Sequence, residues 1–234
     1  MKKTLLYTAL ILGALVFAYP FIWMFFSTFK PDGEIGGIQL LPEIWTWQNY
    51  KLVFDRIPIE KGFVNSAIVT SLVTLSVTLF GSITGYAFSR LKWKGRDAMF
   101  SLSLLTMMIP FQITLIPTYI LIVKLGLTDN LAGLIVPTMV TAFSILLFRQ
   151  SFLTIPQDLI DAARLDGCSE LGILFRIILP LSKPVVVTVA ILTFVANWNE
   201  VLWPLIVIRD QDLMTMPQMV ALFAVGGGSD SSIG

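Results

Sequence analysis

Residues that could carry catalysis or bind a metal are scarce in this chain of 234 residues. It contains no histidine, which removes the commonest general base and the commonest metal ligand. Its one cysteine, Cys168, has no partner for an internal disulfide. The sequence shows no cluster of metal-ligating side chains and no nucleophile placed beside a base. We therefore predict a protein that is not an enzyme and that uses neither a metal nor a cofactor.

The sequence also has no match to the glycine-rich nucleotide-binding loop. No Gly-Lys dipeptide occurs, so the glycine-rich sequence that cradles phosphates has no match. If ATP drives this protein, another chain must bind the nucleotide.

Polar residues interrupt an apolar run near the C-terminal end of the chain. Asn197, Trp198, Asn199 and Glu200 lie within the run 184–208. Asn197 is 13 residues beyond Pro184, or about 20 Å along a helix. Polar groups inside a membrane are costly and usually face protein or water. They therefore indicate either a translocation path or a hydrogen-bonded cluster that holds helices together.

Proline and glycine residues suggest where membrane helices bend or pack. Pro110 and Pro117 are seven residues apart, which would place both on nearly one face of a helix over 98–123. That helix would be a flexible or path-lining element, or merely a kinked one. Gly81 and Gly85 form a small-xxx-small pair, which favours close helix packing.

The segment 154–167 predicts a helix of two or three turns between two apolar runs. Pro156 suits its first position, and Asp158 and Asp161 favour its N-terminal end. Gly167 suits a left-handed stop. The residues expected on its apolar face are Leu159, Ile160 and Ala163.

A second short helix is expected to follow, with Ser169 as its N-cap and Pro180 and Pro184 ending it. The spacing i, i+3, i+4, i+7 predicts an amphipathic stripe of Leu171, Leu174, Phe175 and Ile178. The residues alone leave two interpretations open. The pair of helices could enter a groove of another protein, or it could pack on its own bundle.

Composition indicates an integral membrane protein. The chain is 56% hydrophobic and 13% charged, about half the charge of an ordinary soluble domain, and its mean hydropathy is +0.81. A net charge of +1 indicates no strong electrostatic attraction to nucleic acid. Five runs meet or approach the length of a membrane helix: 4–29, 63–88, 98–123, 131–148 and 184–208. We predict an all-α polytopic membrane helix bundle.

The distribution of basic residues gives the orientation. The short loop 90–96 contains Arg90, Lys92, Lys94 and Arg96, so we place it in the cytoplasm together with the N-terminus. The first run then acts as an uncleaved signal anchor. The segment 149–183 becomes a cytoplasmic loop, and 209–234 becomes an outer tail that ends in a flexible stretch over 226–229.

One spacing resembles a known family. Asp161-Ala162-Ala163, three residues, Gly167, nine residues, Ile177, one residue and Leu179-Pro180 resemble the inner-loop signature of ATP-binding-cassette importer permeases. That signature begins with Glu-Ala-Ala, so Asp161 shortens the acidic side chain by one methylene. Three further segments are similar to the shorter permease of carbohydrate importers of the maltose or glycerol-phosphate type: 107–110, 125–127 and 198–205.

The resemblance implies a mechanism and a set of partners. Permeases of this family pair as two subunits in the plasma (inner) membrane, above a dimer of ATPases, and an extracytoplasmic solute-binding protein delivers the solute. The inner loop couples to the ATPase, and here it would do so through Asp161, Ala162, Ala163, Asp166, Gly167, Phe175, Ile177, Leu179 and Pro180. Such permeases usually have six membrane helices, so we expect five here and a sixth to be missing.

Rival interpretations are a secondary transporter or channel subunit, or a permease of the same class for a solute other than a sugar. Proton-coupled transport usually needs ionisable groups within the membrane, and only Glu200 qualifies. The long inner loop would also have no role in such a protein. A membrane enzyme is disfavoured by the absence of catalytic groups.

Overall fold

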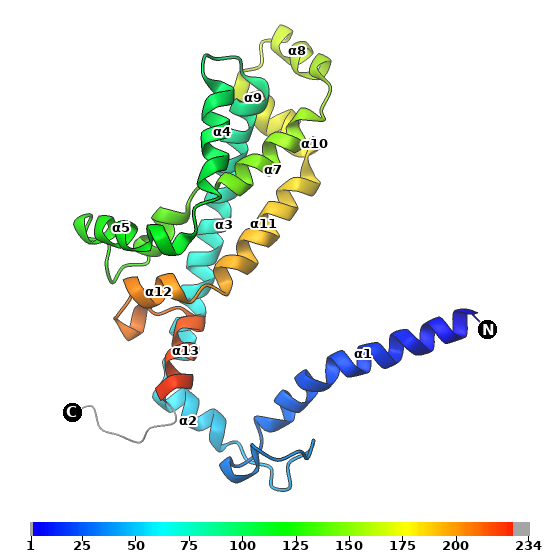
Figure 1. Cartoon of the computed structure of the whole chain (residues 1–234), viewed down its shortest axis with the longest axis vertical. Coiled ribbons are helices and arrows are strands. Elements are labelled where there is room, and N and C mark those ends of the chain that lie inside the picture. Colours follow the sequence, from blue (N-terminus) through cyan, green and yellow to red (C-terminus); the bar gives the residue numbers. More distant parts are fainter. Residues whose placement is uncertain (1, 227–234) are drawn as a thin grey trace. The chain divides into compact units, whose positions relative to one another are not determined.

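The structure is a computed structural model that describes residues 2–226 (Figure 1). The described residues form helices and connecting turns, with none in a strand. The all-α prediction is therefore confirmed. The chain divides into two compact units, 1–59 and 60–234, and each is described by itself.

The first unit contains α1 (Lys2–Ser27), the short η1 (Asp32–Glu34) and α2 (Gln48–Arg56). Beyond α1, the ring of Phe29 lies 5.0 Å from that of Trp47 and 5.6 Å from that of Tyr50. The side-chain amide of Asn49 donates to the carbonyls of Thr28 and Lys30. These contacts fold the segment after α1 back onto the end of the helix.

The second unit holds the remaining helices. They are α3 (Ile59–Arg90), α4 (Arg96–Thr106), α5 (Phe111–Lys124), α6 (Ala132–Ile135), η2 (Val136–Thr138), α7 (Ala142–Leu153), α8 (Gln157–Leu165), α9 (Glu170–Ile173), η3 (Leu174–Ile178), α10 (Leu179–Leu181), α11 (Lys183–Trp198), α12 (Leu202–Val207), η4 (Gln211–Leu213) and α13 (Met216–Gly226).

Two helices, α1 and α3, are each long and apolar enough to cross a membrane alone. Three pairs of shorter helices pass the same test together but are bent at a short break. The bends are 100° between α4 and α5, 45° between the α6–η2 segment and α7, and 86° between the α9–α10 segment and α11. Length and composition therefore allow up to five spans.

Three of the predicted runs are not single helices, and one of them, 131–148, is divided between α6, η2 and α7. The run 98–123 breaks between Thr106 and Phe111, because Pro110 lacks an N–H and disfavours helical backbone in the residue before it. The run 184–208 stops at Trp198 and resumes at Leu202 as α12. The predicted polar group at 197–200 lies at the break between α11 and α12.

The region 209–234 contains two elements that the sequence analysis did not anticipate, η4 and α13. Asn65 of α3 donates to the carbonyls of Asp212 and Met214, and Ser66 accepts the amide of Met216. The start of α13 is therefore fixed to α3. Residues 227–229 of the predicted flexible stretch lie outside the described residues.

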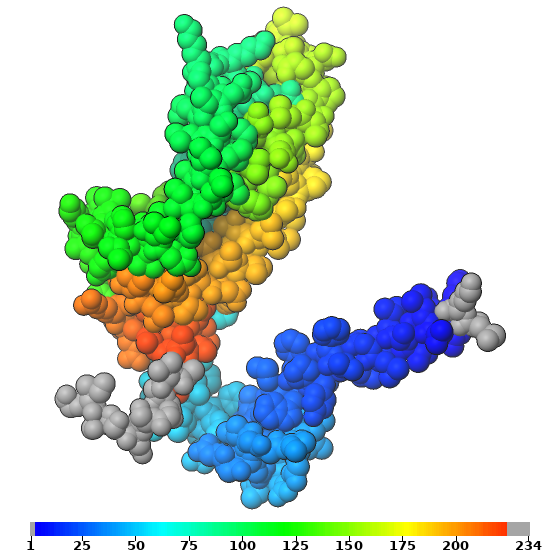
Figure 2. Space-filling view, viewed as in Figure 1, coloured from blue at the N-terminus to red at the C-terminus, as the bar shows by residue number. Residues whose placement is uncertain are grey.

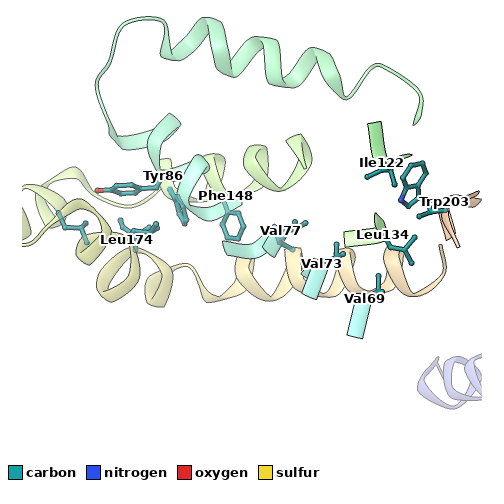
Figure 3. Packing of buried hydrophobic residues seen from close by; sticks show 14 of the residues in the cluster. Val69, Val73, Val77, Tyr86, Ile122, Leu134, Phe148, Leu174 and Trp203 are labelled. Carbon is teal, nitrogen blue, oxygen red and sulfur yellow. The ribbon is translucent and has the colours of Figure 1, made fainter. Parts of the chain in front are cut away.

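The core of the second unit runs along α3 (Figure 3). Val73, Val77 and Phe148 are fully buried there. Tyr86 and Leu174 lie toward one end of this cluster, and Trp203 lies at the other end, as Figure 3 shows. Burial of this apolar surface connects the inner-loop segment with the broken helices around α12 in one continuous core.

Helices α3 and α7 approach closely at two glycines. A Cβ atom added at Gly81 would lie 2.6 Å from the hydroxyl of Ser144. One added at Gly85 would lie 2.6 Å from Cβ of Phe148 and 3.1 Å from the backbone nitrogen of Arg149. Small residues let two helix backbones come together in this way.

Candidate functional site

Helix α8 occupies the centre of the segment singled out by the sequence. Its end has the hydrogen bonds of a Schellman motif: the amide of Gly167 bonds the carbonyl of Arg164, and that of Cys168 bonds Ala163, each at 3.0 Å. Gly167 has φ +80°, in the left-handed region. The turn therefore uses the conformational freedom that only glycine has at low cost.

The two faces of α8 differ sharply. Ile160 and Ala163 are buried against the core, with Ala163 5% exposed. Leu165 is 89% exposed, and Leu159 is also exposed, so the expectation that Leu159 shares the buried face is wrong. Leu159 is one residue from Ile160, which turns it about 100° around the helix from that fully buried position and leaves it at the edge of the buried face. Further residues on the exposed side are Asp161, Ala162, Asp166 and Gly167.

The segment after α8 differs from the predicted amphipathic helix. Ser169 does cap it, because its hydroxyl accepts the amide of Gly172 at 3.1 Å. The backbone then widens into a π-helical turn over Leu174–Ile178, which changes the helical period. Ile173, Leu174 and Ile178 are buried, whereas Leu171 and Phe175 are exposed. The predicted stripe is therefore right for Leu174 and Ile178 and wrong for Leu171 and Phe175.

The other predicted loop residues divide in the same way. Ile177 and Leu179 pack partly against the core. Pro180 is exposed, like Phe175. The predicted loop residues thus form an inner set of Ala163, Ile177 and Leu179 and an outer set that remains accessible.

Arg90, the last residue of α3, holds the connection between α7 and α8. One guanidinium nitrogen donates to the carbonyls of Phe152 and Ile155. Another donates to the side-chain oxygen of Gln157 at 2.8 Å, at the first position of α8. This fork of donors joins three segments at one point, which the compact ammonium of a lysine cannot reproduce.

A second polar contact joins α3 to α8 and α9. The hydroxyl of Tyr86 donates to Oε2 of Glu170 at 2.5 Å. The same carboxylate accepts two bonds from Arg164, at 2.8 and 3.2 Å. The Glu170 carboxylate therefore raises the pKa of the Arg164 guanidinium above its ordinary value. The bidentate geometry fixes α8 against α9.

Asp161, the acidic residue of the family signature, is held within the helix. One of its oxygens accepts from the side chain of Gln157 at 2.9 Å and from Arg164 at 3.2 Å. Because Gln157 also meets Arg90, the four residues form a continuous chain of polar contacts from α3 along α8.

A cavity of about 350 Å³ lies at the other end of the unit, where α3, α5, α11 and α12 meet. This volume falls within the range of small-molecule pockets, roughly 300–1,000 Å³. Seven hydroxyl side chains line it: Ser66, Thr70, Thr114, Thr118, Thr138, Thr141 and Thr215. Its other polar lining residues are Asn197 and Glu200, and its aromatic ones are Phe111 and Trp203.

The structure separates the predicted polar group 197–200. Asn197 and Glu200 line the cavity. Oε1 of Glu200 accepts the amides of Leu202 and Trp203 and so caps the start of α12. Trp198 instead stacks on Phe194 with ring centroids 5.7 Å apart. Asn199 is exposed and bonds back to the carbonyl of Val195, also away from the cavity lining.

The two prolines singled out by spacing also lie apart from the cavity. Pro110 precedes α5 and Pro117 lies within it, so the prediction that both share one face of a single helix is wrong. Neither is among the described residues that line the cavity. The lining face of α5 is formed by Phe111, Thr114 and Thr118, at i, i+3 and i+7.

Sequence reasoning missed the hydroxyl residues, although a signal was present. Ser66 and Thr70 are four residues apart, as are Thr114 and Thr118, within apolar runs. That spacing places each pair on one helix face. Only the fold shows that the two faces meet in one cavity, because α5 turns away from α4 at the break near Pro110.

Comparison with known proteins agrees with this architecture. An arabinooligosaccharides transport system permease protein of Halalkalibacterium halodurans is 35% identical over 225 residues, covering 94% of this chain and 81% of that protein. A lactose transport system permease protein of Rhizobium radiobacter is 31% identical, covering 93% and 80%.

A solved structure has the same fold along nearly the whole chain. It is the crystal structure of a bacterial ABC transporter involved in the import of the acidic polysaccharide alginate. The match has a TM-score of 0.83 and 25% identity, and it covers 99% of this chain and 83% of that one.

A family model described as the inner membrane component of binding-protein-dependent transport systems matches residues 77–224. That range contains α8, the π-helical turn and most of the cavity-lining residues. The chain therefore belongs to the family of binding-protein-dependent transport system inner membrane components.

Proposed function

We propose that this chain is a permease subunit of an ATP-driven importer for a sugar or sugar derivative, and that it forms half of the translocation path. Its partners are a dimer of ATP-binding-cassette ATPases, a second homologous permease and an extracytoplasmic solute-binding protein. It lies in the plasma (inner) membrane with its N-terminus in the cytoplasm. ATP is hydrolysed on the separate ATPase chains.

The names of the relatives support a carbohydrate-type solute. Besides the arabinooligosaccharide and lactose permeases, an sn-glycerol-3-phosphate transport system permease protein of Yersinia pestis is 30% identical, covering 88% of this chain. A different solute class within the same family is the main alternative, and uptake assays with each solute separate the two.

The observation that carries the coupling role is the two-sided construction of α8. Its exposed side offers Leu165, Asp161 and Asp166, which suits a groove with apolar and basic residues. Its buried side packs on the core through Ile160, and Gln157 at its start is hydrogen-bonded to Arg90, the last residue of α3. In the space-filling view the yellow-green α8 forms one end of the unit (Figure 2). A push on α8 would therefore be transmitted directly to α3.

The translocation role is assigned to the cavity beside α12, through Asn197 and Glu200. Trp198, Asn199 and Pro110 would shape the helix breaks beside it, and Pro117 lies within α5 outside the cavity lining. A helix break exposes main-chain polar groups, which in a membrane is tolerated where they face protein or a water-filled path.

Cross-linking in the assembled importer tests the coupling role. In a Cys168→Ser background, Leu165→Cys should form disulfides with cysteines introduced on the ATPase surface. Ala163→Cys, two residues away but buried, is the matched control and should not. Failure of Leu165→Cys across a full set of ATPase positions, with normal ATP-dependent uptake, would contradict docking through α8. Uptake that proceeds without any ATPase would instead favour a secondary transporter or channel.

A further inference from the structure

We propose that the cavity beside α12 binds one neutral sugar ring of the transported solute, so that this permease has a saccharide subsite of its own. The inference rests on the proposed function and narrows it to a class of solute at a defined place. It excludes anionic solutes such as uronic acids and sugar phosphates from this site.

The hydroxyls converge on the cavity from several elements. Ser66 and Thr70 come from α3, and Thr114 and Thr118 from α5. The others come from η2, from the residue before α7 and from the residue before α13. Ser and Thr also occur where membrane helices pack, but here seven of them from separate segments line one cavity, as in a pocket for a polar ligand.

The hydrogen bonds already made inside the cavity define what the ligand must supply. Thr118 donates its proton to the carbonyl of Thr114, and Thr138 donates to those of Leu134 and Ile135. Each of these hydroxyl oxygens keeps lone pairs that can accept. The hydroxyl of Ser66 accepts the amide of Met216.

Two further lining residues, Thr215 and Glu200, retain hydrogen-bonding capacity. Thr215 is only 5% exposed, and its hydroxyl has no hydrogen-bond partner among the described residues. A buried polar group without a partner is costly, which points to a ligand or water at this place. Oε2 of Glu200 remains beside the capping oxygen, and an ionised carboxylate can only accept. The cavity thus presents both acceptors and O–H donors, and the hydroxyls of a polyhydroxylated solute can match either kind.

The charge of the lining argues for a neutral ligand. Glu200 is the one ionisable residue among the described residues that line the cavity, and no lysine or arginine accompanies it there. An anion would meet a like charge without a compensating cation among these lining residues. A uronate or a phosphate ester should therefore bind far more weakly than a neutral sugar.

Aromatic rings and volume set the size of the ligand. Phe111 and Trp203 lie edge to face at 5.9 Å, and the Trp203 indole is fixed by a hydrogen bond of 3.1 Å to the carbonyl of Gly133. Their apolar surfaces can cover the C–H face of a sugar ring. A volume of about 350 Å³ is at the small end for ligand pockets, which fits one ring rather than a whole oligosaccharide.

Protection of an introduced thiol tests the site directly. In the Cys168→Ser background, which removes the one native cysteine, T138C and T114C place reporters on two elements of the lining. The exposed Q211C serves as the control outside the cavity. Each full-length chain is reconstituted in lipid nanodiscs and modified with a methanethiosulfonate reagent. The probes are the neutral saccharides arabinotriose, lactose and maltotriose, and the anionic trigalacturonate.

At least one neutral saccharide should slow modification of both cavity reporters and leave Q211C unaffected. Trigalacturonate should protect at least tenfold less well at equal concentration. Adding Thr118→Val to T138C should raise the saccharide concentration for half-protection about fivefold, the effect of one lost hydrogen bond. Thr188→Val, on an exposed part of α11 outside the lining, should not change it.

ATP-dependent uptake of the same saccharides by the assembled importer distinguishes a failure of the subsite from a failure of the proposed importer function. If uptake occurs but no neutral saccharide protects either reporter, or trigalacturonate protects equally well, the subsite is wrong and the permease function stands. If the importer shows no ATP-dependent uptake of any of the four probes, the sugar importer assignment itself fails. Protection without such uptake would leave a saccharide site in a protein of another function.

Discussion

The hydroxyl of Tyr86 donates a hydrogen bond of 2.5 Å to Oε2 of Glu170, joining residues 84 positions apart in the chain. It ties the last turn of α3 to the segment that follows α8. Tyr86→Phe keeps the buried ring and removes only this bond, which should lower the free energy of unfolding by about 1–2 kcal/mol. Thermal unfolding of the purified chain in detergent measures the loss.

Tyr119→Phe, on a ring that packs against the same core, is the matched control and should change stability much less. In the assembled importer, Tyr86→Phe should also increase the ATP hydrolysed per solute transported. An unchanged ratio would show that this bond supports the fold without contributing to coupling.

Arg90 connects the end of α3 to the end of α7 and the start of α8 through several hydrogen bonds at once. Arg90→Lys keeps the charge but cannot donate to the carbonyls of Phe152 and Ile155 and to Gln157 at the same time. We expect a stability loss of about 1–3 kcal/mol and reduced uptake. The exposed Lys92→Ala is the control. Equal melting temperatures for the two variants would contradict the anchoring role.

The turn after α8 can be tested without altering any contact. Nothing lies within 4 Å of a Cβ atom built on Gly167, so Gly167→Val introduces only backbone strain at φ +80°. That strain costs roughly 1–2 kcal/mol for an L-residue. ATP hydrolysis should then proceed with less transport. Gly167→Asn, which tolerates the left-handed region better, should restore most of the coupling.

The contact between α3 and α7 predicts a ranking of three alanine substitutions. Gly85→Ala should destabilise most, by about 1–3 kcal/mol, because its Cβ meets both a side chain and the backbone of Arg149. Gly81→Ala meets only side chains, those of Ser144 and Phe148, and should cost less. Gly13→Ala, with open space around it, should be neutral or stabilising. Thermal unfolding of the three variants gives the order, and a reversed order would refute the close approach.

Asp129 provides a pH-dependent contact in the loop between α5 and α6. Its carboxylate accepts the amides of Arg209 and Asp210, at 2.5 and 3.0 Å, which lowers its pKa below the ordinary value. A lowered folded-state pKa stabilises the protein above the unfolded-state pKa, about 3.9, and this stabilisation is lost as pH falls through the folded value. Asp129→Asn should therefore melt earlier than the parent at pH 7.

The difference between parent and Asp129→Asn should shrink as the pH falls below about 4. The exposed Asp158→Asn is the control and should show a smaller effect at pH 7. If the difference in melting temperature between the parent and Asp129→Asn stays constant down to low pH, the carboxylate charge is not the source of the stabilisation.

Features of this fold that depend on neighbouring residues can be predicted from the sequence, whereas features that depend on contacts between distant segments cannot. The helix over Gln157–Leu165 and the glycine at its end follow from local signals, because caps and turns depend on neighbouring residues. The π-helical turn over Leu174–Ile178 does not, since tertiary packing moved Phe175 out of the predicted apolar stripe. Periodicity assumes a constant number of residues per turn, and that assumption fails there.

The lining of the cavity could likewise be predicted from the sequence only in part. Glu200 was visible in the sequence because a charge in an apolar run is conspicuous. Thr118 and Thr138 were not, because threonine is common in membrane helices, where its hydroxyl can bond its own backbone. Their shared role depends on the bend between α4 and α5, which hydropathy alone does not reveal.

Two of the groups that accept from Arg90 are main-chain carbonyls, those of Phe152 and Ile155. A carbonyl is present whatever side chain the residue bears, so position 155 can vary during evolution without loosening this joint. The guanidinium itself has no substitute among the natural side chains. Homologous permeases should therefore retain arginine at position 90, while position 152, whose side chain is buried in the core, should vary only among apolar residues.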